Sequence, residues 1–351
     1  RARTARLTTS EVRPDGTIDG QLELEELPDQ SVEFLGGFGS YERLRGGVRF
    51  TDRNLFGRGL IGSVAGRLSQ RGWRPTAGLT DQDLFGTPFV GNITVEAFER
   101  EEPSFTDSAV GGTVSVTRRW LGKLRSRLSY AYFDRTGAEV DVLDPAAALE
   151  QYTEGRVTLD LEWDAQDSVL IPRNGYSLRF GVDVQDPALA SDIEIVRLRT
   201  AATYHRELTD WLRIGLRAEA GWLFPQNGSA NVPLPERFFN GGEDTLRSFR
   251  EDLQGPLDAN GALVGGEFRN LFSAELRFPL FNSIEFALFG DAGNVGSRVE
   301  SYGFSDMRYA VGPGLRWWLP IGPVRLDAGH NPDRRPGEDE WVIFFSVGYP
   351  F

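Results

Sequence analysis

Residues 212–222 read Leu-Arg-Ile-Gly-Leu-Arg-Ala-Glu-Ala-Gly-Trp, and their alternation decides the fold class. Every even position from Leu212 to Trp222 is apolar, whereas the odd positions hold arginine, glutamate or glycine. A period of two places successive side chains on opposite faces of an extended strand. The stretch therefore predicts a β-strand with one apolar face and one polar face.

The same alternation recurs through the second half of the chain, at residues 157–163, 176–184, 272–278, 284–288 and 341–351. The predicted strands run about 9 to 13 residues, longer than the ~5 to 6 usual in globular proteins and close to the ~9 to 11 that cross a bilayer at a tilt. Several end in tryptophan, as an aromatic girdle at a membrane interface requires: Trp120, Trp163, Trp222 and the pair Trp317 and Trp318. Length and strand ends together favour a transmembrane barrel over a sandwich.

Sixteen strands are predicted, an even number as bacterial barrels require. They cover residues 31–39, 42–54, 60–71, 73–83, 90–100, 108–119, 122–134, 152–164, 175–185, 193–206, 211–223, 269–280, 283–292, 307–318, 322–330 and 341–351. We therefore expect an all-β fold with an antiparallel transmembrane β-barrel over residues 31–351. Residues 1–30 read as a separate hairpin, Ala5 to Val12 and Ile18 to Leu27 around Pro14-Asp15-Gly16.

The composition argues against several other classes of protein. The chain has 51 Asp+Glu against 38 Lys+Arg, and a net charge of -13 argues against binding to nucleic acid. With no cysteine and two histidines there is little material for a metal site, and no cofactor is expected. No apolar run approaches the ~18 residues of a membrane helix, which excludes a helical membrane protein.

The connection between Trp222 and Asn270 is too long for a structureless loop, so a functional role is expected. It contains Pro-Leu-Pro-Glu-Arg-Phe-Phe-Asn-Gly-Gly-Glu-Asp-Thr-Leu-Arg-Ser-Phe at 233–249, followed by Phe272–Leu280, Phe289–Val295 and Val311–Asp327. These segments resemble, in order, the loop signature and last strands of the outer-membrane assembly-factor superfamily of BamA and TamA type. Residues 164–176 and 53–59 look like two of its turns, and residues 1–30 resemble the end of a periplasmic POTRA domain.

The resemblance implies a long loop folded into the lumen. Its residues would be an acidic lead-in at Glu236, paired glycines Gly241 and Gly242, and a tetrad Leu246, Arg247, Ser248 and Phe249, where Ser248 replaces the family's usual glycine. Alternation independently places Glu275, Glu285 and Asp291 on the polar, lumen face. Because an unpaired buried charge is costly, we expect Arg247 to pair with Asp291 and with Glu275. The alternative is an Arg247 solvated at an external loop tip.

The closing strand is the second candidate site. Its apolar positions are expected to face lipid: Trp341, Ile343, Phe345, Val347, Tyr349 and the terminal Phe351. Its seam partner should be residues 31–39, so the seam would contain Gly36, Gly37 and Gly39 on one strand and Ser346, Gly348 and Phe351 on the other. Glycine weakens strands and leaves register poorly specified, which predicts a lateral gate. The alternative is that the glycines only ease barrel curvature.

The resemblance implies an assembly factor of a Gram-negative-type outer membrane that inserts client outer-membrane proteins, arriving as unfolded chains, without nucleotide or metal. Its partners would be outer-membrane lipids, those clients, and periplasmic or lipoprotein accessory subunits. The alternatives are a polypeptide-secreting pore of the two-partner type, a diffusion porin, and a barrel enzyme. An enzyme is disfavoured because His205 and His330 lack an evident catalytic setting. We also expect the chain to be a piece that lacks its upstream POTRA domains.

Overall fold

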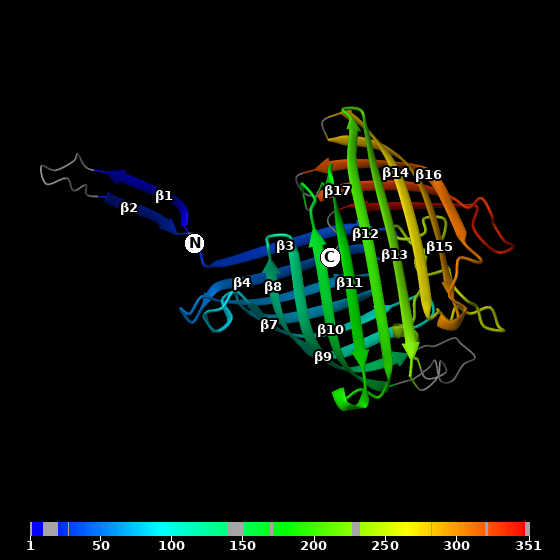
Figure 1. The fold of residues 1–351 in the computed structure, drawn as a ribbon, viewed down its shortest axis with the longest axis horizontal. Helices are drawn as coiled ribbons and strands as arrows, with labels where there is room; N and C mark the ends of the chain where they lie inside the picture. Colours follow the sequence, from blue (N-terminus) through cyan, green and yellow to red (C-terminus); the bar gives the residue numbers. More distant parts are fainter. Residues whose placement is uncertain are drawn as a thin grey trace, which may run out of the picture.

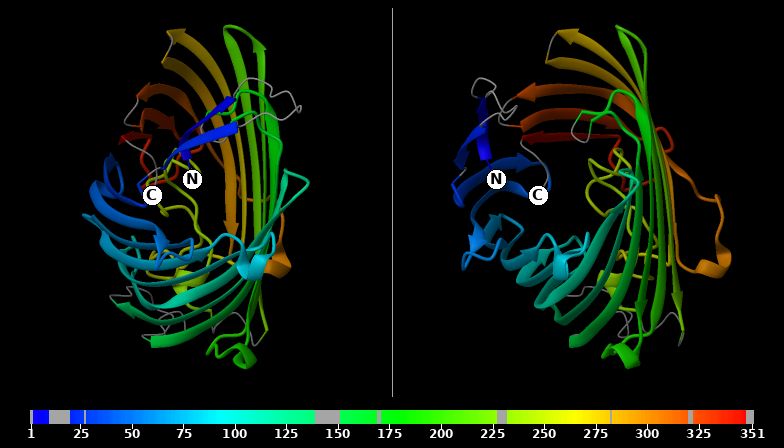
Figure 2. Two further views of the ribbon diagram at one scale, coloured as in Figure 1. Left: turned by 90° about the vertical axis from the view of Figure 1, so that its left-hand side faces the viewer. Right: turned by 60° about the vertical axis from the view of Figure 1, so that its left-hand side comes forward.

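The predicted sixteen-stranded antiparallel barrel is confirmed. A computed structural model describes residues 2–9, 20–26, 28–138, 151–168, 171–226, 232–281, 283–319 and 322–347. Strands β3 to β18 form one closed barrel in which each strand pairs with its neighbours in the chain, and β18 returns to β3 (Figure 1). Figure 2 shows the ring of strands from two further sides.

The observed strands lie within a few residues of the predicted ranges. They are β3 (Gln30–Gly39), β4 (Arg43–Leu55), β5 (Leu60–Ser69), β6 (Gly72–Asp81), β7 (Val90–Glu101), β8 (Thr106–Trp120), β9 (Leu124–Ala138), β10 (Gln151–Asp164), β11 (Gly175–Gln185), β12 (Ile195–Thr209), β13 (Leu212–Pro225), β14 (Phe268–Phe281), β15 (Ile284–Gly296), β16 (Arg308–Leu319), β17 (Gly322–His330) and β18 (Trp341–Val347). Short 3-10 turns include η1 (Leu84–Gly86), η2 (Pro187–Leu189), η4 (Leu234–Glu236) and η5 (Val299–Ser301). No helix among the described residues is long and apolar enough to span a membrane.

Alternation sorts side chains between the outside and the inside of the barrel. Leu216, Phe272 and Leu288 are each 40 to 44% exposed on the outer face, whereas Asp291 and Glu285 are buried on the inner face. This arrangement puts apolar side chains toward lipid and lets charged side chains pair with one another inside.

The predicted Trp317 and Trp318 girdle pair is corrected by the same rule. Trp317 is 43% exposed on the outer face, but Trp318 lines an internal cavity beside Arg247 and Arg316. Adjacent residues of a strand point to opposite faces, so only one of the two can reach the interface.

The N-terminal hairpin lies outside the barrel sheet (Figure 1). Its strands are β1 (Ala2–Thr9), which begins three residues before the predicted strand, and β2 (Gly20–Glu26), which is shorter than predicted; the Pro14-Asp15-Gly16 turn lies outside the described residues. Since β3 begins directly after the hairpin, we call that end of the barrel the hairpin end. The opposite end, where β13 leaves the wall, is the loop end.

Candidate lumen lock and strand seam

The segment between β13 and β14 folds against itself. Its backbone pairs at Phe238 and Gly266, with N–H to O=C distances of 2.8 and 2.9 Å, and again between Asn240 and Gln254. The chain of this segment, yellow-green in Figure 2, runs within the ring of strands. Its side chains meet inward-facing wall residues, as where Phe238 packs at Gly221 of β13.

Two glycines close the turn that carries the tetrad. Gly241 and Gly242 have φ values of 111° and 116°, which only glycine adopts without strain. A Cβ on Gly241 would lie 2.3 Å from the Arg250 carbonyl oxygen. The Gly242 amide donates to the Phe249 carbonyl at 2.9 Å, so the paired glycines close a compact turn over residues 241–253.

Arg247 is held on the inner wall by two acidic residues. Its Nε donates to Asp291 Oδ2 at 2.7 Å and its terminal nitrogens reach Asp291 Oδ1 and Glu275 Oε1, each at 2.6 Å. The guanidinium also lies 3.5 Å from the ring centroid of Phe289. Arg247 is 2% exposed, so the solvated alternative does not describe this structure. Planar forked donors suit this bidentate pairing.

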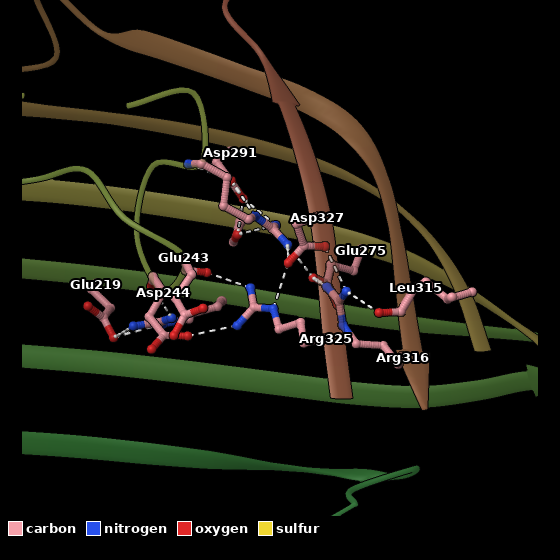
Figure 3. Close-up of polar contacts among 12 residues, drawn as sticks. Glu219, Glu243, Asp244, Glu275, Asp291, Leu315, Arg316, Arg325 and Asp327 are labelled. Carbon is pink, nitrogen blue, oxygen red and sulfur yellow. Dashed lines mark hydrogen bonds and ion pairs between the residues drawn. The ribbon is translucent and has the colours of Figure 1, made fainter. Parts of the chain in front are cut away.

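The acids that hold Arg247 belong to a larger charge network (Figure 3). Arg316 donates to Asp327 at 2.6 Å and to Glu275 at 3.1 Å, and Arg325 donates to Asp327 at 2.6 Å. Arg325 also reaches back to the loop at Asp244, 2.8 Å away. Charges from β14 to β17 are thus neutralised together with those of the loop.

The remaining tetrad residues seat the turn against the wall. Leu246 and Phe249 pack with Phe289 and Ala310, and Ser248 Oγ donates to the Tyr309 carbonyl at 2.8 Å. Ser248 is not among the described residues of positive φ, so the position does not require a glycine.

Glycine is needed instead on the opposing strand. A Cβ on Gly329 of β17 would come within 1.8 Å of the Arg247 carbonyl oxygen. The loop backbone can approach the wall this closely only because residue 329 has no side chain.

Two predicted lock residues lie elsewhere. Glu236 is buried near the loop end, where Arg197, Gln185 and Tyr152 contact its carboxylate. Burial alone would raise its pKa, but the surrounding arginines, Arg197 foremost, hold the pKa at about 2. Its carboxylate therefore anchors the start of the segment, away from Arg247.

Glu285 lies on the inner face as predicted, but its carboxylate pairs with Arg213 of β13. It shares the wall with the Arg247 cluster without joining it. Conversely, the charge cluster around Arg247 includes three residues that are not predicted from the sequence, namely Asp327, Arg316 and Arg325. Their alternate spacing on the polar face of β16 and β17 was the available signal.

Up to Val347, the last described residue, the seam between β3 and β18 is short. Within the described residues, the ladder joins these strands only at Ser346 with Gly39 and Val347 with Phe38. On its other side, β18 pairs with β17 along its whole described length. Beyond the ladder, Ser40 Oγ accepts from the Phe345 amide at 2.7 Å. Most of one edge of β18 therefore has no strand partner among these residues.

The seam glycines differ in how closely they are packed. A Cβ on Gly37 would lie 2.6 Å from the Val347 carbonyl oxygen, whereas Gly36 and Gly39 have nothing within 4 Å of that position. Trp341, Ile343 and Phe345 are 38 to 65% exposed on the outer face and Val347 is half-buried. Gly348, Tyr349 and Phe351 lie outside the described residues.

The loop lies next to the seam. Glu243 and Ser346 of β18 line the same cavity, and the Glu243 backbone carbonyl accepts from Arg325. Burial and the neighbouring Asp244 raise the pKa of Glu243, while Arg325 and the Ser346 hydroxyl oppose that rise. The turn that carries Arg247 therefore lies beside the last strand.

Two curated relatives with the same name match nearly the whole length of this chain. The outer membrane protein assembly factor BamA of Neorickettsia risticii is 26% identical over 357 residues, covering 95% of this chain and 47% of that protein. BamA of Neisseria meningitidis serogroup B is 25% identical over 391 residues, covering 95% and 48%. The chain thus spans about half the length of the curated relatives it matches.

Solved structures show the same fold. BamA from Haemophilus ducreyi lacking POTRA domains 1–3 superposes with a TM-score of 0.83 at 16% identity, covering 99% of this chain and 75% of that one. CdiB from Acinetobacter baumannii gives 0.56 at 12% identity, covering 98% and 65%. The barrel is one of a Gram-negative-type outer membrane. A family model described as the Omp85 superfamily domain matches residues 54–351, and the chain belongs to that superfamily.

Proposed function

We propose that this barrel inserts and folds client outer-membrane proteins by opening its seam. The observation that carries the proposal is the short ladder between β3 and β18, restricted among the described residues to Ser346–Gly39 and Val347–Phe38. The curated relatives that are named BamA and called assembly factors support the same role. The work is strand pairing and needs no bond-breaking chemistry.

An unpaired strand edge is a template for another strand. The N–H and C=O groups along β18 that lack a β3 partner can pair with an extended client segment, which adds main-chain hydrogen bonds. A client arriving as an unfolded chain would gain those bonds at the membrane, where unpaired backbone groups are costly. Outer-membrane lipid is then the second partner of the reaction.

The Arg247 cluster would hold the loop against the barrel wall and so brace the last strands. It ties the loop to β14 and β15 through Glu275 and Asp291, and Glu243 of the same turn shares a cavity with Ser346 of β18. Loss of the loop contact would leave the last strands without that internal brace. We therefore assign the loop the role of a lock on the seam.

A disulfide across the seam tests the gate, because the chain contains no natural cysteine. Phe38→Cys with Val347→Cys joins register partners of β3 and β18, and Val114→Cys with Tyr130→Cys joins partners of β8 and β9 as a control. In proteoliposomes, oxidation should stop insertion of a client barrel only in the seam variant, and reduction should restore it. Full insertion with the seam oxidised would refute the gate.

A polypeptide-secreting pore is the second candidate, supported by the fold shared with CdiB. Such a pore moves its cargo through the lumen and should work equally well with the seam disulfide closed. The same variant therefore separates the two functions.

The hairpin and the accessory subunits complete the proposal. We assign β1 and β2 to the end of a periplasmic POTRA-like domain, since β3 follows them directly at the hairpin end. That domain and lipoprotein subunits would deliver clients to this end. Binding of an unfolded client to a longer chain, compared with residues 31–351 alone, tests this assignment.

A further inference from the structure

Five arginines gather on the inner wall between β9 and β14, in a chain whose net charge is -13. A cavity of about 740 Å³ lies against this wall and extends to Phe238 of the loop. Its charged lining comprises five arginines and three acids, namely Arg125, Arg127, Arg179, Arg199, Arg269, Asp160, Glu162 and Glu219. Five minus three leaves a formal charge of +2.

Strand register explains how the arginines converge. Arg125 lies opposite Glu162, which lies opposite Arg179, so these three residues form one row across β9, β10 and β11. The next row holds Arg127 and Asp160 on β9 and β10, then Gly181 and Arg199 on β11 and β12. Strands lie ~4.8 Å apart, so the guanidinium groups of both rows reach a common space.

Three of the five arginines are already neutralised. Arg125 pairs with Glu162, Arg199 with Asp183 at 3.0 Å and with Asp160 at 3.4 Å, and Arg269 with Glu219 at 3.1 Å. Gly181 makes room for Arg199, because a Cβ there would lie 3.1 Å from its guanidinium.

Arg127 and Arg179 are the two left over. Neither side chain forms an ion pair or hydrogen bond with another residue in the part of the chain that the structure describes. Ser115 and Thr117 of β8 add hydroxyl donors to the same cavity. The surplus charge of the lining therefore resides on these two side chains.

We propose that this cavity binds a small dianion, a phosphate monoester or a dicarboxylate, between Arg127 and Arg179. Guanidinium forks match the oxygens of both groups, and the cavity volume falls within the range of small-molecule sites. The site is separate from the Arg247 cluster and from the seam, so it does not depend on the proposed function.

Titration calorimetry of the detergent-solubilised protein at pH 8 and low salt tests the site, with inorganic phosphate and succinate as probes. Arg127→Gln and Arg179→Gln should each weaken binding about tenfold, and added salt should weaken it further. Arg58→Gln, in the exposed β4–β5 turn, is the matched control and should leave binding unchanged. Binding of phosphate alone or of succinate alone would each support the site and assign its ligand chemistry.

Asp160→Asn should change the binding affinity in the opposite direction. It removes one acid from the lining and should tighten binding several-fold, a gain that misfolding cannot produce. The proposal is overturned if neither probe binds the unaltered protein at tens of millimolar, or if the Arg127→Gln/Arg179→Gln protein binds as well as the unaltered one.

Discussion

Replacing Arg247 by alanine should release the loop from the barrel wall. The Asp291 side chain is fully buried, and its other side-chain partner among the described residues is the Ser273 hydroxyl. Glu275 keeps Arg277 at 2.8 Å and Arg316 at 3.1 Å, so the loss falls mainly on Asp291. Removing one partner of a buried ion pair costs about 3–5 kcal/mol, and we expect loop docking to weaken by that amount.

Hydrogen exchange of the amides in residues 241–253 measures this directly. A loss of about 3–5 kcal/mol speeds exchange through loop opening by roughly two to three and a half orders of magnitude. Arg250→Ala is the matched control in the same turn, because its pair with Asp339 at 3.0 Å is largely exposed and should be worth at most ~1 kcal/mol.

The double variant Arg247→Ala/Asp291→Ala provides a second check. It removes the stranded carboxylate as well as the guanidinium, so it should recover part of the loss. If Arg247→Ala and Arg250→Ala exchange at similar rates, the buried pair does not hold the loop and the reasoning fails.

Three further outcomes follow from the packing and the charges. Gly329→Ala should displace the turn from the wall as Arg247→Ala does, because its Cβ would lie 1.8 Å from the Arg247 carbonyl oxygen. Protease cleavage within residues 241–253 measures this displacement, and a loop that stays protected would contradict the prediction. Gly37→Ala should loosen the seam, whereas Gly36→Ala should not, because a Cβ on Gly36 has no atom within 4 Å. An equal yield of cross-linking across the seam in both variants would contradict this steric argument. Burial, aided by a neighbouring acid, raises the pKa of Glu251 to about 8, above the 4.5 of a free glutamate, so the folded loop binds the proton more tightly. Docking of the loop should therefore weaken as the pH rises from about 5 to 8, and Glu251→Gln should flatten that dependence in the exchange experiment.

The sequence predicted much of the architecture because its signal is local. A period of two needs only neighbouring residues, so β13 and β15 and the inward positions of Glu275, Glu285 and Asp291 could be read directly. The loop was found by its length and by the tetrad ending at Phe249, which needs no knowledge of the fold. Individual strand ends differ by a few residues, as expected where turns decide them.

Closure of the barrel decided which of these residues meet. The acidic partners of Arg247 could be predicted from the sequence. The partners of two other acids could not, because the folded barrel pairs Glu285 with Arg213 and Glu236 with Arg197. The described pairing of Ser346 and Val347 with β3 and the close approach at Gly329 likewise depend on where distant strands come to lie. The alternation within a strand determines whether a side chain points into the lumen or toward lipid. Which side chains meet across the lumen depends on the tilt and stagger of all the strands, and no short stretch of sequence encodes that geometry.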